Sequence, residues 1–308
     1  MSLENIYKPV KNDLEKVEKL LQQTLFSKDQ IIKKITFPLS SGKGKMMRPA
    51  LVLLSSTIFE KTSKSSIDFA VACELVHDAA LVHDDIIDKE KVRRGKKTIN
   101  YLWGNQIAVL FGDYIYAKAS EIVARLGNKK ISVILANTIY KMCVGEIKES
   151  ATRFKSDISE EFYMEIIKEK TAVLFSACCE IGAILAGASQ LEVKKMSNYG
   201  MNLGMAFQIR DDILDFTSDG MTLPLIYVWQ VATYKDKKII EQFFESNGNN
   251  PGEKIIKEIA QKYKAFNYSL KIAQRYALES VNEIENFKDS SAKHSLTELA
   301  HYAIIRDK

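Results

Sequence analysis

Residues 66–88, SIDFAVACELVHDAALVHDDIID, form a long, mostly apolar run that ends in three aspartates. The run contains neither glycine nor proline, which favours an uninterrupted helix. It predicts one long helix from Ser66 to Asp88, with Ser65 or Ser66 as the N-cap. The aspartates would lie at the C-terminal end of this helix, where the helix dipole disfavours negative charge. Some compensating cation is therefore expected there.

The rest of the chain continues as helix after helix. Gly127 marks the end of a helix that begins at Gln106, and Ser189–Glu192 is a capping box that opens a helix reaching Asp215. A long helical segment is expected from Ser159 to about Ala186. With 14 glycines and 5 prolines in 308 residues, the chain has too few turn-forming residues for an all-β fold. We expect an all-α fold of ten or more helices in a single domain, residues 1–308, with a basic loop at 89–98 and a turn at 247–252.

Charge and hydropathy exclude several classes of protein. The net charge of +5 comes without a basic run interleaved with aromatic residues, so nucleic-acid binding is not expected. There is no apolar run of 18 residues or more, and Met1–Lys11 is polar, so neither a transmembrane segment nor a signal peptide is expected. These features and the lack of a CxxC pair predict a cytoplasmic protein with buried, reduced cysteines, at positions Cys73, Cys143, Cys178 and Cys179.

The same acidic pattern occurs twice. Asp84-Asp85-Ile-Ile-Asp88 and Asp211-Asp212-Ile-Leu-Asp215 are both Asp-Asp-x-x-Asp, each near the end of a predicted helix. The first and last aspartate of each cluster are four residues apart, so their carboxylates share a helix face and repel each other. A hard divalent cation would relieve this repulsion, because carboxylate oxygens are its natural ligands. The alternative is that both clusters are solvated helix ends.

Small residues precede both clusters on the same helical faces. They are Cys73, Val76, Ala79 and Ala80 before the first cluster, and Gly200 and Gly204, with Gln208, before the second. Glycine within a helix costs up to about 1 kcal/mol relative to alanine, so something must come close to it. If the two helices face each other, the acidic ends would hold metals above a narrow apolar channel. Close packing between helices over small residues is the alternative.

Basic residues lie in short loops beside these helices and within one helix. They are Lys43, Lys45 and Arg48 before Pro49; Arg93, Arg94, Lys96 and Lys97 after Asp88; and Lys170, followed by Thr171, inside an apolar run. Metals on one side and arginine or lysine on the other are suited to a polyphosphate ligand. Each basic residue alone is more often a solvated loop charge.

Together these residues resemble the trans-isoprenyl diphosphate synthase family, over essentially the whole chain. Gly44-Lys45-Met-Met-Arg48-Pro49 resembles that family's Gly-Gly-Lys-x-x-Arg-Pro loop, with Lys43 in place of the first glycine. The resemblance implies a bundle of mostly antiparallel helices around a deep cavity. It also implies a homodimer, or a heterodimer with a small regulatory subunit. A peripheral membrane contact for product release is expected as well.

The resemblance also assigns roles to residues. Lys45, Arg48, His77 and Arg94 would hold the diphosphate of isopentenyl diphosphate, and Arg93 and Lys170 that of the allylic substrate. Thr171 and Gln208 would face the developing carbocation, and together with Lys170 they would be the catalytic residues. The metal ligands would be Asp84, Asp88 and Asp211, supported by Asp85, Asp212 and Asp215, and three Mg²⁺ ions are expected with diphosphate bound. The reaction is ionisation of the allylic diphosphate, attack by the alkene and loss of a proton.

Product length depends on the helix below the first cluster. Short-chain members resemble one another in having a bulky aromatic residue four or five positions before the first aspartate, where this chain has Ala80 and Ala79. With Val76 one turn further down, the chain-length residues are all small or medium. From Asp84 to Cys73 the helix extends roughly 16 Å, enough for several isoprene units. We therefore expect a long all-trans product of about C30–C40, a precursor of quinone side chains.

One departure concerns the loop after the second cluster. The family usually has Gly-Lys-Pro and a further aspartate there, whereas Asp215-Phe-Thr-Ser-Asp-Gly220 runs directly into Met221-Thr-Leu-Pro224. The loop is either naturally short or lacks a segment in this sequence, and we favour the second reading. The alternatives for function are a geranylgeranyl or farnesyl diphosphate synthase, a subunit that is inactive without its partner, and a class I terpene cyclase.

Overall fold

The computed structural model describes residues 2–40, 44–59, 62–153, 155–217, 220–246 and 252–306. Nearly all of their regular structure is helical, which confirms the predicted all-α fold. Lys43 and residues 247–251 of the predicted turn lie outside the described residues. The chain divides into two compact units, each assembled from three separate stretches of sequence. The prediction of a single domain over residues 1–308 stays a prediction.

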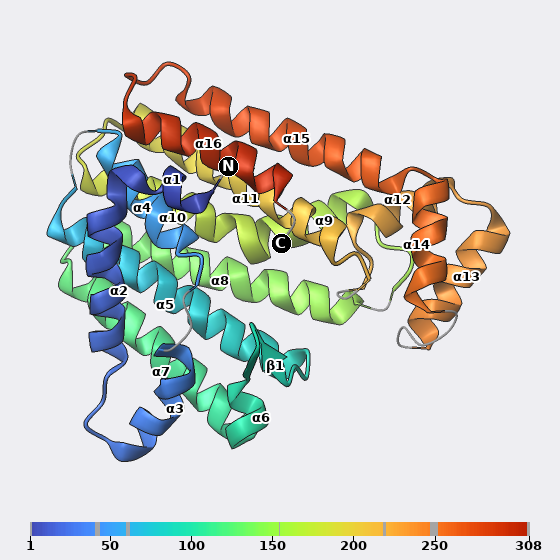
Figure 1. Ribbon diagram of the computed structural model, residues 1–308, viewed down its shortest axis with the longest axis horizontal. Helices are drawn as coiled ribbons and strands as arrows, with labels where there is room; N and C mark the ends of the chain where they lie inside the picture. Colours follow the sequence, from blue (N-terminus) through green and yellow to red (C-terminus); the bar gives the residue numbers. More distant parts are fainter. Residues whose placement is uncertain are drawn as a thin grey trace. The chain divides into compact units, whose positions relative to one another are not determined.

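Unit 1 consists of Met1–Ala136, Cys178–Val193 and Lys288–Ser295. Its elements are α1 (Leu3–Ile6), η1 (Lys8–Val10), α2 (Lys11–Leu25), α3 (Gln30–Ser40), α4 (Met47–Thr57), α5 (Lys64–Ile87), β1 (Val92–Arg93), β2 (Lys96–Lys97), α6 (Ile99–Trp103) and α7 (Asn105–Arg125). α5 contacts α2, α4 and α7, and Figure 1 shows α7 running alongside it. Phe69–Cys73 of α5 is completely buried, so this helix forms the centre of the unit.

The start of α5 corrects one prediction. The N-cap is Ser63 rather than Ser65 or Ser66, and its side chain accepts a hydrogen bond from the backbone N–H of Ser66. The Ser66 hydroxyl accepts in return from the N–H of Ser63, which completes a capping box. Lys64, Ser65 and Ser66 therefore belong to the first turn of the helix. Because a capping box can have serine at both of its ends, the sequence alone did not show which serine is the N-cap.

The basic loop after α5 contains a short antiparallel hairpin that the sequence did not predict. Val92 pairs with Lys97 and Arg93 with Lys96. Arg94 and Gly95 connect the strands with φ of 51° and 75°. Two central residues with positive φ suit a two-residue hairpin turn, because their twist matches that of the strands. The hairpin therefore fixes the positions of the arginines on it.

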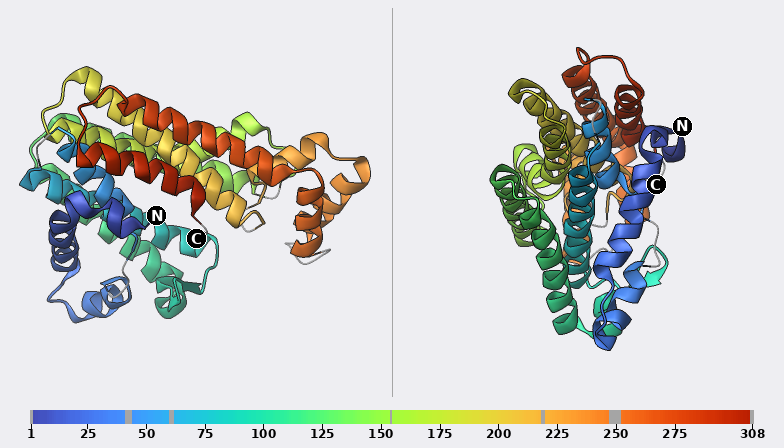
Figure 2. Two further views of the ribbon diagram at one scale, coloured as in Figure 1. Left: turned by 45° about the horizontal axis from the view of Figure 1, so that its top comes forward. Right: turned by 90° about the vertical axis from the view of Figure 1, so that its left-hand side faces the viewer.

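Unit 2 consists of Asn137–Ala177, Lys194–Phe287 and Leu296–Lys308. Its elements are α9 (Glu160–Ile167), η2 (Lys168–Ala172), α12 (Leu223–Val231), α13 (Tyr234–Glu245), α14 (Glu253–Lys262) and α15 (Ala265–Ile284). Four helices have residues in both units: α8 (Lys129–Thr152), α10 (Val173–Leu185), α11 (Gln190–Leu214) and α16 (Ser291–Ile305). Figure 2 shows α12, α13 and α14 gathered in unit 2, where α12 also contacts α15.

A π-helical turn, η2, interrupts the long helical segment predicted from Ser159 to Ala186. It lies between α9 and α10 and contains Lys170 and Thr171. Gly145 of α8 packs directly against it, because a Cβ on Gly145 would lie 2.5 Å from the backbone nitrogen of Lys170. π turns are uncommon and often occur at functional sites. The predicted capping box of α11 is confirmed, since the N–H of Ser189 donates to Oε2 of Glu192 at 2.7 Å.

The cysteines and the hydropathy of the helices were also predicted from the sequence. Cys73, Cys178 and Cys179 are buried as expected, but Cys143 is exposed on α8, so the prediction for this cysteine is wrong. Helix periodicity around Cys143 did not distinguish the two faces of α8. No helix in the described part of the chain is long and apolar enough to cross a membrane.

Candidate active site

The basic loop before α4 lies next to the hairpin turn. A Cβ added to Gly44 would be 3.2 Å from Nη1 of Arg94 and 3.4 Å from Oε1 of Glu74. The loop therefore passes close to a guanidinium group and a carboxylate. Lys45 is exposed, and Arg48 is partly buried in the first turn of α4. Residues predicted to bind one diphosphate thus come from two separate stretches of unit 1.

Two carboxyl groups on α5 face these arginines, and the sequence reasoning missed both. Glu74 and Asp78 are one turn apart, and both interact electrostatically with Arg48 and Arg94. Burial raises the pKa of Glu74, and the two arginines oppose that rise. Burial and the charge of Glu74 raise the pKa of Asp78 to about 8. Acids four residues apart in an otherwise apolar helix were the signal that could have revealed them.

His77 shares this environment. Burial lowers its pKa well below the usual value, and Arg48, Arg94 and Arg93 lower it further. The imidazole is therefore neutral at physiological pH, and one ring nitrogen carries a proton that it can donate. A neutral donor beside two arginines is compatible with binding a diphosphate oxygen, as predicted.

The first acidic cluster is held by the hairpin. Asp85 is 6% exposed, and its Oδ1 accepts a hydrogen bond from Nε of Arg93 at 2.5 Å. The backbone carbonyl of Asp85 accepts another from Nδ2 of Asn100 at 2.9 Å. Burial raises the pKa of Asp85, while Arg93 lowers it. Arg93, predicted to contact the allylic diphosphate, thus forms an ion pair with a cluster residue, whereas Asp84 and Asp88 are only partly buried.

The predicted chain-length residues lie on the same helix. Val76 and Ala79 are completely buried, and Ala80 is partly buried. Nearer the cluster, α5 approaches α7 as closely as a glycine allows, because a Cβ on Gly112 would lie 2.2 Å from Nε2 of His83. The same nitrogen lies 3.2 Å from the carbonyl oxygen of Val109. At positions 76, 79 and 80, α5 therefore has no aromatic side chain; its one phenylalanine, Phe69, is completely buried further down the helix.

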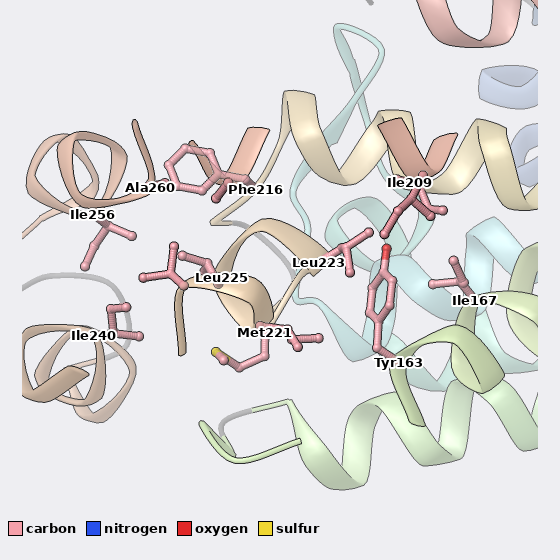
Figure 3. Close-up of a cluster of buried hydrophobic side chains, with 14 of the residues drawn as sticks. Tyr163, Ile167, Ile209, Phe216, Met221, Leu223, Leu225, Ile240, Ile256 and Ala260 are labelled. Atoms are coloured by element: carbon pink, nitrogen blue, oxygen red, sulfur yellow. The ribbon is translucent and has the colours of Figure 1, made fainter. Parts of the chain in front are cut away.

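The second acidic cluster has different partners. Asp212 is 7% exposed, and its Oδ2 accepts a hydrogen bond from the Tyr163 hydroxyl at 2.5 Å. Its Oδ1 accepts from Nε2 of Gln208 at 2.7 Å. The hydroxyl of Thr171 donates in turn to Oε1 of Gln208 at 2.7 Å. Figure 3 shows Tyr163 rising from α9 towards α11 near Ile209, with its hydroxyl foremost.

The predicted catalytic residues Thr171 and Gln208 are therefore in direct contact, and they form a hydrogen-bonded row that ends at Asp212. Lys170, on the same π turn, forms ion pairs with Glu146 at 2.9 Å and with Glu149. Neither glutamate was singled out from the sequence. A lysine at this position is suited to contact a diphosphate, although both of its pairing carboxylates come from α8.

A pocket opens beside this row, with about 480 Å³ of empty space that includes some open to solvent. Its lining combines apolar and polar side chains of unit 2: Ile158, Ile166, Ile167, Met221, Glu149, Thr152, Arg153, Tyr163, Lys170, Gln208, Asp212 and Thr222. Three of these residues, Tyr163, Ile167 and Met221, also belong to the hydrophobic core of the unit (Figure 3). The pocket and the core of unit 2 therefore share side chains.

The mid-helix glycines of α11 have a packing role. A Cβ on Gly200 would lie 2.5 Å from the carbonyl oxygen of Phe175, and one on Gly204 would lie 2.5 Å from Cα of Ala172. Both glycines let α11 pack against the backbone of η2 and α10. The structure thus favours the alternative of close helix packing over the idea that these glycines line a channel.

The aspartates of the two clusters are accessible enough to bind a divalent cation but do not form a complete metal site by themselves. In the described part of the chain, no three His, Cys, Asp or Glu side chains are arranged to hold a metal ion. Asp84, Asp88 and Asp215 are partly or fully accessible, and the Asp211 side chain is 36% exposed. Mg²⁺ commonly takes one or two carboxylates and completes its shell with water and substrate phosphates. The clusters fit a cation that arrives with a diphosphate better than one held in an all-protein site.

The segment after the second cluster is compact. The Thr222 hydroxyl donates to the carbonyl oxygen of Phe216 at 2.8 Å, and Phe216 and Met221 are buried. Gly220 has φ of 90°, and a Cβ there would lie 2.3 Å from the carbonyl oxygen of Arg153. Ser218 and Asp219 lie outside the described residues. The two sides of the loop are therefore joined closely around a glycine that no other residue could replace without strain.

Comparisons with known proteins cover the whole chain. The family model described as polyprenyl synthetase matches residues 29–263. Octaprenyl diphosphate synthase from Escherichia coli (strain K12) is 31% identical over 324 residues, with 100% of both chains covered. Heptaprenyl diphosphate synthase component 2 from Bacillus subtilis (strain 168) is 32% identical, covering 98% of this chain and 90% of the relative. The alignment with the Escherichia coli enzyme has 324 positions, so at least 16 of them are gaps in this chain of 308 residues.

Solved structures agree with these relatives. A decaprenyl diphosphate synthase from Rhodobacter capsulatus is 27% identical, with a TM-score of 0.94 over 100% of both chains. A polyprenyl synthase from Caulobacter crescentus CB15, complexed with calcium and isoprenyl diphosphate, is also 27% identical. Its TM-score is 0.93, and the match covers 100% of this chain and 98% of that one. By its matching family model and its full-length relatives, this chain belongs to the polyprenyl synthetase family and is a prenyltransferase.

Proposed function

We propose that this chain condenses isopentenyl diphosphate with an allylic diphosphate in a Mg²⁺-dependent reaction and makes a long all-trans polyprenyl diphosphate. The observation that carries the proposal is the hydrogen-bonded row of Thr171, Gln208 and Asp212 beside Lys170. The row places oxygen lone pairs and a cation next to an acidic cluster. Family membership supports the class of reaction, and the site residues extend it to this sequence.

Thr171 is suited to stabilise positive charge. Its hydroxyl proton is donated to Gln208, so the lone pairs of its oxygen point elsewhere and remain available. Gln208 is fixed in turn by its bond to Asp212. We infer that these two side chains face the allylic carbon as its bond to the diphosphate oxygen breaks. Preoriented dipoles of this kind stabilise a developing charge without reorganising during the reaction.

The diphosphates are assigned to the basic residues. We assign Lys45, Arg48, His77 and Arg94 to isopentenyl diphosphate, and Arg93 and Lys170 to the allylic diphosphate. Bound divalent cations, three Mg²⁺ in our proposal, would stabilise the departing diphosphate through Asp84, Asp88 and Asp211, with Asp85, Asp212 and Asp215 in support. The solved relative complexed with calcium and isoprenyl diphosphate supports a divalent cation at such a site.

The reaction then balances without a protein nucleophile. The allylic C–O bond breaks, and the diphosphate leaves with the electron pair. The alkene of isopentenyl diphosphate attacks the carbocation, which forms the new C–C bond. A proton is lost from the resulting cation to the released pyrophosphate. Apolar side chains exclude the water that would otherwise quench the cation.

The small side chains at Val76, Ala79 and Ala80 support the long product of about C30–C40. Ala80→Phe would place an aromatic ring on α5 one turn before Asp84. We expect this variant to make products shorter by one or more isoprene units, at a similar overall rate. Chromatography of the dephosphorylated products tests this. Unchanged product length would rule out the α5 channel, and Asp68→Ala on the same helix serves as the control.

The reaction itself is tested by one incubation. Purified protein, labelled isopentenyl diphosphate, a farnesyl or geranylgeranyl diphosphate primer and Mg²⁺ should give a ladder of extended products. The expected ladder ends near C30–C40, about seven isoprene units. A ladder that ends at geranylgeranyl would favour the short-chain alternative. No extension of either primer would contradict the proposed function, unless a partner subunit restores it.

A second candidate is that this chain is one component of a two-subunit enzyme. The observation that favours it is the Bacillus subtilis relative, which is named component 2 of a heptaprenyl diphosphate synthase. Addition of a small regulatory subunit would then convert an inactive chain into an active heterodimer, whereas a homodimer would be active alone. We place either assembly in the cytoplasm, with a peripheral membrane contact for release of the apolar product.

A further inference from the structure

Arg306, directly after α16, is fixed by a set of contacts of its own. Its guanidinium group lies 3.6 Å from the centre of the Phe207 ring, and its Nη2 donates to the Phe207 carbonyl at 2.9 Å. The backbone carbonyl of Arg306 accepts hydrogen bonds from Nε and Nη2 of Arg210, at 3.0 and 2.8 Å. The side chain is only 3% exposed. These contacts hold the guanidinium against α11 whether or not it has an acidic partner.

The same group forms an ion pair with the second acidic cluster. Nη2 of Arg306 lies 2.6 Å from Oδ1 of Asp211. In the part of the chain that the structure describes, Arg306 is the one cation paired with this aspartate. Asp211 is 36% exposed, so its carboxylate also faces solvent. A buried, immobile cation therefore contacts an accessible carboxylate that we assign to metal binding.

The positive charge of Arg306 has opposite effects on the metal-free and the metal-bound second cluster. Without a metal, Asp211 and Asp215 repel each other at the end of α11, where the helix dipole adds to the repulsion. The positive charge of Arg306 offsets both effects. With a divalent cation bound at Asp211, the same positive charge repels that cation over a few ångströms. Arg306 thus stabilises the metal-free cluster relative to the metal-bound one.

A bound diphosphate changes this balance. Its negative charge attracts Arg306 as well as the metal, so the repulsion between the two cations is largely offset. We propose that Arg306 is a resident counter-cation of the second acidic cluster. It neutralises Asp211 while the site is empty, and it makes divalent-cation binding there depend on a diphosphate. The inference deepens the proposed function and rests on it, because the metal site at Asp211 is part of that proposal.

Binding of Mn²⁺ to the full chain tests this, with free Mn²⁺ counted by electron paramagnetic resonance. Arg306→Met keeps an apolar stem against Phe207 but removes the charge. Without pyrophosphate, the variant should bind Mn²⁺ about fivefold to tenfold more tightly than the wild type. With saturating inorganic pyrophosphate, the difference should fall below about twofold. Equal or weaker Mn²⁺ binding by Arg306→Met without pyrophosphate would overturn the inference.

Two further variants separate charge from folding. Arg306→Lys keeps the positive charge but loses the planar group that stacks on Phe207, so its Mn²⁺ affinity should stay within about twofold of the wild type. If Arg306→Lys binds Mn²⁺ as tightly as Arg306→Met, the effect comes from disturbed packing and the inference is wrong. Lys293→Met is the matched control, because Lys293 is also on α16 and pairs with Asp289 at 2.8 Å. It should leave Mn²⁺ binding unchanged.

The wild type distinguishes this inference from the proposed function. Wild-type protein that binds no Mn²⁺ even with pyrophosphate would contradict the proposed metal site, and the inference with it. Wild-type protein that needs pyrophosphate to bind Mn²⁺, alongside an Arg306→Met variant with the same requirement, would overturn the inference alone. Thermal unfolding in EDTA shows whether each variant is folded before the titration.

Discussion

The two acidic clusters have the same spacing but different surroundings. In each, the middle aspartate is buried, with Asp85 6% and Asp212 7% exposed. Asp85 is paired with the charged Arg93 of the hairpin, whereas Asp212 accepts hydrogen bonds from the neutral Tyr163 and Gln208. The repeated pattern therefore determines which carboxylate turns inward. The charge of its partner depends on the neighbouring elements, which are the hairpin for Asp85 and both α9 and the preceding turn of α11 for Asp212.

The difference extends to the helices that carry the clusters. α5 has alanine at 79 and 80, while α11 has Gly200 and Gly204, each pressed against the backbone of a neighbouring helix. α5 is also closely packed, but there the glycine belongs to its neighbour: Gly112 of α7 accommodates the His83 side chain beside the first cluster. The glycines beneath the second cluster therefore belong to the cluster's own helix, and the glycine beside the first cluster belongs to the partner helix.

The largest expected effect is on turnover. Asp84→Ala and Asp211→Ala each remove an accessible carboxylate, and each should lower kcat/KM by about 10²- to 10³-fold or more. They should differ in stability, because only Asp211→Ala leaves the buried Arg306 without its acidic partner. Thermal unfolding in EDTA should show a larger fall in Tm for Asp211→Ala than for Asp84→Ala. Asp68→Ala on α5 is the control, and an equal fall in Tm for both cluster variants would contradict the contrast.

The next effect is on helix packing. Gly204→Ala would place a Cβ 2.5 Å from Cα of Ala172 and 2.9 Å from its Cβ. To make room for the added Cβ, the backbone at Ala172 and the closely packed α11 would have to move apart. We therefore expect a loss of about 1–3 kcal/mol in the free energy of unfolding. Urea denaturation measures it. Asn202→Ala, on the partly exposed side of the same turn, should change stability by less than about 0.5 kcal/mol, and a similar loss in both variants would argue against the close contact.

A smaller effect on stability is expected when the partner of either buried aspartate is removed, and it should differ between Asp212 and Asp85. Tyr163→Phe removes a hydrogen bond to the buried Asp212 and should cost about 1–2 kcal/mol, independent of salt. Arg93 is 35% exposed, so Arg93→Met should cost only about 1 kcal/mol, and less in 1 M NaCl. Denaturation at low and high salt compares them. If the two losses respond equally to salt, the proposed difference in partner charge has no energetic consequence.

A last effect concerns the pH dependence of stability and involves Asp78, in the first region only. Its pKa is raised from 3.8 to about 8, so the folded state keeps a proton that the unfolded chain releases. The free energy of unfolding should therefore fall as pH rises from about 4 to about 8. Asp78→Asn removes this slope, so its stability relative to the wild type should be greater at pH 8 than at pH 4.

Urea denaturation at several pH values tests this expectation for Asp78→Asn. The advantage of the variant should shrink towards pH 4, where the wild-type carboxyl group is protonated in both states. Asp68→Asn on the same helix should show no such trend. An advantage that stays constant with pH would mean that the substitution acts through packing rather than through the proton.

The sequence predicted the helices and both clusters because apolar periodicity, capping residues and local spacing are visible within a few turns. It did not predict the hairpin at 92–97, whose strands have only two residues each and carry no alternation. Nor did it reveal Arg306, which reaches Asp211 across 95 positions of sequence. Glu74 and Asp78 were missed because burial of a charged pair depends on the arginines that approach from other elements.

The π turn at Lys168–Ala172 implies that this stretch cannot change length. It contains, in effect, one residue more than an α helix would need over the same rise. Deleting that residue would leave an ordinary α-helical turn and would change where Lys170 and Thr171 point. Tyr163 in α9 and Thr171 in the π turn could then no longer both reach the Gln208–Asp212 pair. Loops elsewhere can gain or lose residues, but a single-residue deletion here should inactivate the protein as surely as loss of an aspartate.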